Sequence, residues 1–125
     1  MTYDPYHTPD SEQWNELDEM ERIHMVERYQ RLRKIRLPSL RNHAAMHVVV
    51  ENQVAMGDEY PAKSVLERLM REGLDRHQAI HAISQLLAEE IFHVLKRKTG
   101  ETEINARYIE RLNRLTAEAW RNQTL

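Results

Sequence analysis

Glycine and proline are scarce in this chain, and their positions limit the structures that it can form. The 125 residues include only three Gly and four Pro, the two residues that most strongly interrupt helices. Pro38, Gly57, Gly73 and Gly100 separate long segments that are rich in Ala, Leu, Glu, Arg and Gln, which are strong helix formers. The spacing of these breakers predicts an all-α protein of about five helices.

Within these segments, apolar residues recur every three or four positions, as they do along one face of a helix. The five predicted helices lie near residues 11–37, 40–56, 58–73, 75–98 and 103–121. Three successive valines at 48–50 favour a strand by propensity, but no neighbouring segment offers a pairing partner. The helix at 40–56 carries apolar residues around nearly all of its circumference, so we expect it to be the most buried.

Length and composition fit one compact helical bundle. A chain with 41% hydrophobic and 30% charged residues is close to ordinary globular usage, and its length suits a single core. We therefore expect one domain over residues 1–125, with a flexible N-terminal segment at 1–10. That segment lacks the basic start and apolar run of a signal peptide. No apolar run approaches the length of a membrane span, so we expect a cytoplasmic protein without a membrane partner.

Charge and cysteine content narrow the classes of function. The chain has no Cys, which excludes disulfides and thiolate metal sites. Its net charge of −2 gives no overall attraction for nucleic acid, and a helix-turn-helix at residues 65–83 would offer too few basic residues to bind phosphates. Trp14 and Trp120 are candidate anchors for a homo-oligomer or a protein partner.

Two His-x-x-x-His sequences stand out as a candidate metal site. His43 and His47 lie on the second predicted helix, and His77 and His81 lie on the fourth. Residues four apart on a helix are neighbours, so each pair can direct two imidazoles at one ion. If the helices at 40–56, 58–73 and 75–98 alternate up-down-up, the first histidines of the two pairs lie level, as do the second. We predict a site formed by all four histidines and Glu51, one turn beyond His47.

Imidazole and carboxylate ligands suit a divalent ion such as zinc, iron or nickel. Both pairs lie near the N-terminal ends of their helices, where the helix dipole opposes a cation. A nearby carboxylate is therefore needed, and Glu51, Asp75 and Glu89 are candidates. Neither first histidine is followed by Glu, which argues against a zinc peptidase. The sequence indicates no substrate, and it leaves open whether such a site is catalytic, structural or regulatory.

A metal-free arrangement accounts for the same pattern. Unpaired polar groups in a core cost about 1–3 kcal/mol, so four buried imidazoles can instead hydrogen-bond one another or nearby groups. In this alternative the protein is a non-enzymatic interaction module with a buried histidine network. The remaining histidines, His7, His24 and His93, are expected at the surface or at its rim.

Three stretches of the chain carry a family likeness. They are His43-x3-His47-x3-Glu51-Asn52-Gln53-x3-Gly57-Asp58, then Leu69-x3-Gly73-Leu74-Asp75-Arg76-His77-x-Ala79-Ile80-His81-Ala82-Ile83, and Leu87-Ala88-Glu89-Glu90-Ile91. In order and spacing they resemble a bacterial family known as domain of unknown function number 1841. The likeness places a family-like core at 37–98 and implies a small helical protein in which the histidine motifs matter, although the position matching His77 varies. It names no reaction, and the first predicted helix is expected to be particular to this chain.

Overall fold

The computed structural model describes residues 1–35, 39–97 and 101–122. Within these ranges the chain is helical and contains no β-strand, which confirms the predicted class. The elements are α1 (Ser11–Glu16), α2 (Glu19–Leu32), α3 (Leu40–Ala55), the 3₁₀ helix η1 (Gly57–Glu59), α4 (Ala62–Arg71), α5 (Arg76–Arg97), α6 (Glu101–Arg114) and α7 (Ala117–Asn122). None of the helices described has the length and apolar character needed to cross a membrane.

The first and fifth predicted helices are each divided in two. Between α1 and α2, Leu17 and Asp18 have extended backbone, with ψ of 145° and 168°. Asp18 accepts from the backbone N–H of Glu21, whose side chain bonds back to Asp18, forming a capping box. Before α7, the Thr116 hydroxyl accepts from the Ala119 N–H. In both places a side-chain acceptor begins a new helix.

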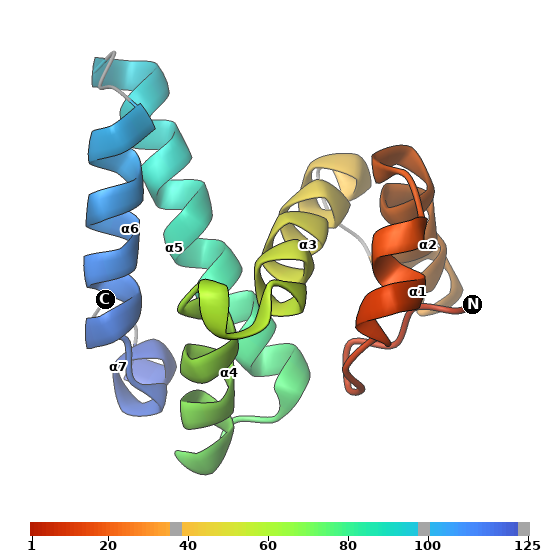
Figure 1. The fold of residues 1–125 in the computed structure, drawn as a ribbon, viewed down its shortest axis with the longest axis horizontal. Coiled ribbons are helices and arrows are strands. Elements are labelled where there is room, and N and C mark those ends of the chain that lie inside the picture. The colour runs from red at the N-terminus through yellow and green to blue at the C-terminus, as the bar shows by residue number, and fades with distance from the viewer. Residues whose placement is uncertain (36–38, 98–100, 123–125) are drawn as a thin grey trace.

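Helix α3 lies between two groups of helices, with α1 and α2 on one side and α4, α5 and α6 on the other (Figure 1). It contributes to the apolar core on both sides. Val48 packs in a cluster with Trp14 and Tyr3, whereas Val50 and Val54 belong to the larger cluster formed with α4 to α7. The apolar circumference predicted for this helix is explained by its two packed faces.

The turn between α4 and α5 positions the second histidine pair. Gly73 has φ of +108°, a conformation that glycine adopts without steric cost. The Gly73 N–H bonds to the Met70 carbonyl and the Leu74 N–H to the Leu69 carbonyl, which is a Schellman motif. Helix α5 then begins after Asp75, which forms the expected capping box with Gln78.

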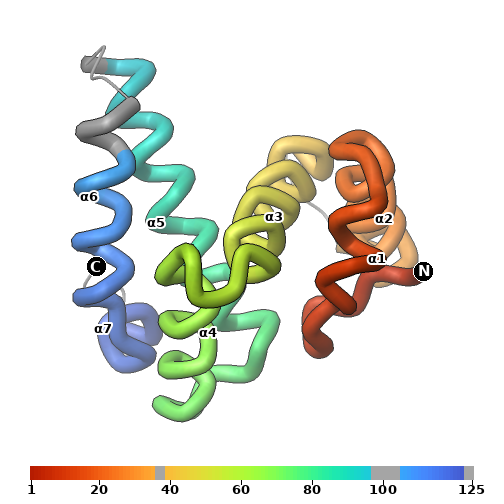
Figure 2. The backbone as a smooth tube through the Cα atoms, viewed as in Figure 1, coloured from red at the N-terminus to blue at the C-terminus, as the bar shows by residue number. Residues whose placement is uncertain are grey.

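The up-down-up order of α3, α4 and α5, on which the level pairing of the histidines depended, does not occur. Figure 2 shows α3 descending in the view, α4 continuing downward and α5 rising. The connection through η1 does not reverse the chain, so the reversal comes only at the α4–α5 turn. In this view α3 and α5 therefore have opposite vertical senses and cross each other at a steep angle.

Residues of the N-terminal segment and one of the two tryptophans are buried against the helices. The segment at 1–10, expected to be flexible, places buried Tyr3 and Pro5 against the helices. Trp14, a candidate interface anchor, is fully buried and donates its Nε1–H to Asn52 Oδ1 at 2.8 Å. It is therefore part of the core and not an exposed anchor, while Trp120 is half-buried.

Candidate metal centre

The four histidines of the two motifs come together where α3 crosses α5. Within each helix, the ring centroids are 4.6 Å apart for His43 and His47 and 4.3 Å apart for His77 and His81. Between the helices, His43 lies 5.2 Å from His81, and His47 lies 4.9 Å from His81 and 5.7 Å from His77. His47 and His81 are thus close, as the level pairing predicts, but each also contacts the other histidine pair: His81 lies against His43, and His47 lies against His77. This mixed pairing follows from the crossing of the two helices.

Three of the four rings offer nitrogens to a common point. Among the described residues, one ligand nitrogen each from His43, His47 and His81 lie within 4.8 Å of one another. Zinc binds imidazole nitrogen at about 2.0–2.1 Å, so two ligands of a tetrahedral ion lie roughly 3.4 Å apart. Binding of an ion would bring the three ligand nitrogens slightly closer together. His77 is outside this group and contacts the Tyr6 hydroxyl through Nδ1 at 3.4 Å.

The environment keeps these imidazoles neutral. Burial, followed by the neighbouring His81, lowers the pKa of His47 to about 2. Burial also lowers the pKa of His81 to about 4, with His77 as the next cause. The pKa values of His43 and His77 are lowered as well, again chiefly by burial. Neutral imidazole is the form that binds a metal ion, so the cluster is ready to act as a ligand set at neutral pH.

Two nitrogens in the cluster lack a partner. The Nε2 atoms of His47 and His81 are buried and form no hydrogen bond within the part of the chain that the structure describes. No hydrogen bond joins two of the four described rings either. An unsatisfied buried polar group costs about 1–3 kcal/mol. A metal-free histidine network, the alternative drawn from the sequence, would instead pair these atoms in hydrogen bonds.

A buried ion pair adjoins the cluster. Arg76 donates to both oxygens of Glu51, with Nη2 at 2.7 Å from Oε1 and Nη1 at 2.9 Å from Oε2. The Tyr3 hydroxyl donates to Glu51 Oε2 at 2.7 Å. Arg76 also donates to the Pro5 carbonyl and the Thr8 hydroxyl, which attaches the N-terminal segment to α5.

Tyr3 connects this ion pair to the cluster. Its hydroxyl lies 3.4 Å from His47 Nδ1, and its own proton points to Glu51. The phenol oxygen is therefore placed to accept from an Nδ1–H of His47. That tautomer leaves the lone pair of His47 on Nε2, the nitrogen without a partner. Burial, reinforced by the charge of Glu51, raises the pKa of Tyr3, so the phenol keeps the proton that it donates.

The structure does not place Glu51 among the three converging histidines. Both of its oxygens are bonded to Arg76 or Tyr3, so direct metal ligation would require the ion pair to break. Asp75 is exposed, and Glu89 pairs with Arg111 at 2.9 Å. The three carboxylates considered as partners for a cation are therefore used elsewhere or open to solvent.

Sequence reasoning missed the two residues that hold Glu51. Arg76 has one detectable signal, since a cation at the first position of a helix opposes the helix dipole and calls for a nearby anion. Tyr3 has none, because it lies before the first helix and outside any periodic pattern.

The family model described as domain of unknown function (DUF1841) matches residues 12–114. The chain belongs to this family. Comparisons with curated proteins and with solved structures found no match. In this DUF1841 domain the match includes α1 and α2, so the expectation that the first predicted helix is particular to this chain is wrong. All four clustered histidines and Arg76 lie within the match, whereas Tyr3 lies before it.

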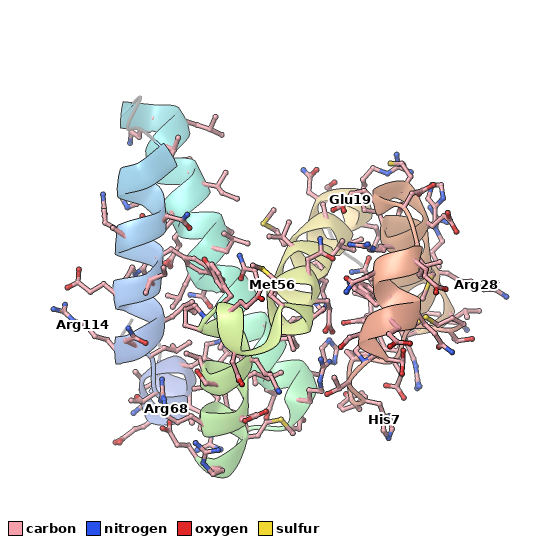
Figure 3. All side chains as sticks on the ribbon, in the orientation of Figure 1. His7, Glu19, Arg28, Met56, Arg68 and Arg114 are labelled. Atoms are coloured by element: carbon pink, nitrogen blue, oxygen red, sulfur yellow. The ribbon has the colours of Figure 1, made fainter. Side chains whose placement is uncertain are left out.

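The other histidines of the chain stand apart from the cluster, as expected. His7 is exposed at the outer edge of the N-terminal segment (Figure 3) and pairs with Asp4 at 2.8 Å. His24 is exposed on α2, and His93 is half-buried near the end of α5. Among the described histidines, the candidate centre therefore draws only on the two motifs, with His43, His47 and His81 converging and His77 beside them.

Proposed function

We propose that this DUF1841 domain binds one divalent first-row transition metal ion through His43, His47 and His81. Zinc, iron and nickel are the candidate ions, because neutral imidazole is a good ligand for all three. The supporting observation is the pair of buried Nε2 atoms, on His47 and His81, that have no hydrogen-bond partner in the described chain. His77, whose ring lies 4.3 Å from that of His81, is assigned a flanking position beside the three ligands.

The metal-free alternative accounts for less of this geometry. A histidine network that stabilises a core would exchange hydrogen bonds between its rings, because each unpaired nitrogen costs free energy. The clustered rings instead leave two nitrogens unpaired and keep the imidazoles neutral. Coordination of an ion would satisfy both nitrogens at once, and an ion held by three side chains from two helices would also join α3 to α5.

Metal binding is tested on protein purified without a nickel column. Stripped protein is dialysed against Zn²⁺ or Co²⁺, and the bound ion is measured together with the visible spectrum of the cobalt form. We expect one ion per chain. Replacing His81 by alanine is expected to weaken binding by more than about a hundredfold, because loss of a ligand should exceed the 10–100-fold cost of losing a group that only orients one.

His81 and His43 are the preferred positions for substitution because they are half-buried, whereas His47 is 2% exposed and its replacement endangers folding. His24→Ala, an exposed histidine on α2, is the matched control and should bind as the natural sequence does. A stripped protein that takes up no ion, or a His81→Ala variant with unchanged affinity, would refute the proposed site.

Tyr3 is expected to act as a positioning residue for the metal. Tyr3→Phe removes the hydroxyl that contacts His47 Nδ1 and leaves the ring in place. Because the contact of 3.4 Å is long, the expected loss of Co²⁺ affinity is about tenfold, the low end for groups that orient a ligand. Competition with a chelator measures it. Tyr6→Phe, next to His77, should change the affinity less, and equal effects of the two variants would contradict this role for Tyr3.

A further inference from the structure

A pocket opens directly onto two of the three proposed ligands. It has a volume of about 340 Å³ and is lined by His43, Met46, His81, Ser84, Gln85, Ala88 and Trp120. These residues come from α3, α5 and α7. The volume lies at the lower end of the range for small-molecule sites, so a ligand of only a few atoms would fit.

An ion held by these three rings would keep one coordination position open, and the pocket is the space next to two of its ligands. Three protein ligands occupy three positions of a tetrahedral ion and leave one for an outside molecule. His47 is buried and does not line the pocket, while His43 and His81 are half-buried and do. An incoming molecule would therefore approach between His43 and His81, with His47 behind the ion.

The charge of the site favours an anion at that open position. Three neutral imidazoles leave both positive charges of a divalent ion uncompensated. The charge of Glu51 is already balanced by Arg76 at 2.7 Å. The charge of Asp75 acts on both His77 and His81, and that of Asp4 acts on His77, in each case raising the pKa against the effect of burial. Neither carboxylate lines the pocket. The ion itself would be the largest local charge of the site, so an anionic ligand gains more here than a neutral one.

The lining of the pocket indicates the chemical character of the rest of the anionic ligand. Met46, Ala88 and Trp120 give it a mainly apolar lining, and Gln85 adds an amide. The Ser84 hydroxyl is buried without a hydrogen-bond partner among the described residues. A carboxylate on the ion, with one oxygen within reach of Ser84 and a short hydrocarbon body against the apolar wall, uses each of these features.

We propose that the pocket binds a small organic monocarboxylate, with the carboxylate on the metal ion and the hydrocarbon body between α3, α5 and α7. This inference rests on the proposed metal site. It assigns to that site a ligand class and a direction of entry, and it makes the ion accessible instead of purely structural.

The test uses the full chain loaded with Co²⁺, whose visible absorption responds to a change of ligand. Butyrate is titrated into the cobalt protein, with butanol as a neutral molecule of similar size. We expect butyrate to shift the cobalt bands in a saturable manner and butanol to leave them unchanged. In Ala88→Leu, a larger side chain at an exposed position of the lining narrows the pocket and leaves the three proposed ligands unchanged, and butyrate binding should weaken about tenfold or more.

Ala106→Leu is the matched control, because it makes the same change at an exposed position of α6 outside the pocket lining. It should respond to butyrate as the natural sequence does. Cobalt bands that ignore butyrate, or an Ala88→Leu variant that responds normally, would overturn the carboxylate pocket and leave the metal site intact. Failure to form the cobalt bands at all would instead refute the metal site itself.

Discussion

Replacing Arg76 by methionine is expected to destabilise the protein by about 3–5 kcal/mol, the usual cost of removing one partner of a buried ion pair. The side chains of Arg76 and Glu51 are 2% and 1% exposed, so water cannot take the place of the guanidinium. Only Tyr3 would remain as a donor to the carboxylate. The loss is measured as a fall in the free energy of unfolding in urea at pH 7.

Two variants separate this effect from a general sensitivity to substitution. Arg114→Met removes an exposed ion pair with Glu110 and should change stability by less than about 1 kcal/mol. In the double variant Arg76→Met with Glu51→Leu, no buried charge remains unpaired, and most of the lost stability should return. A single Arg76→Met variant within 1 kcal/mol of the natural sequence would contradict the role of this ion pair.

Helix positions follow from the sequence where a glycine or a strong cap marks the boundary. Gly57 and Gly73 end α3 and α4 close to the predicted residues, and Asp75 begins α5, because these signals act within one turn of the chain. The break between α1 and α2 carries a similar signal in Asp18 and Glu21. It was overlooked because the flanking apolar residues continue with a helical period across the break.

The sequence also shows that the two histidines of each motif share one helical face, because a spacing of four places two rings on the same side of a helix. Which histidine of α3 faces which histidine of α5 does not follow from the sequence. Whether α3 and α5 run parallel depends on the path of η1 and α4, which is set by long-range packing. The same limit applies to Glu51. Its position one turn after His47 suggested a ligand, but its partner Arg76 lies on another helix, and residue spacing carries no information about such pairing.

Acid is expected to destabilise the metal-free protein well above the pH at which carboxylates titrate. The pKa of His47 is about 2 in the folded chain, compared with about 6.5 in the unfolded chain. The unfolded state therefore binds a proton that the folded state excludes, and stability falls as the pH drops below about 6.5, by roughly 1.4 kcal/mol per pH unit. At pH 5 the loss from His47 alone is about 2 kcal/mol relative to pH 7.

This loss is measured by urea unfolding at pH 7 and pH 5 in the presence of a chelator, so that metal release does not contribute. Ordinary carboxyl groups, with pKa values near 4, add little within this window. A folded His47→Gln variant cannot take up the proton, and it should lose about 2 kcal/mol less between the two pH values than the natural sequence. His24→Gln, at an exposed position, should keep the full dependence. Equal stability of the natural protein at pH 7 and pH 5 would mean that His47 takes up its proton in the folded state, which a buried ring among three other imidazoles should resist.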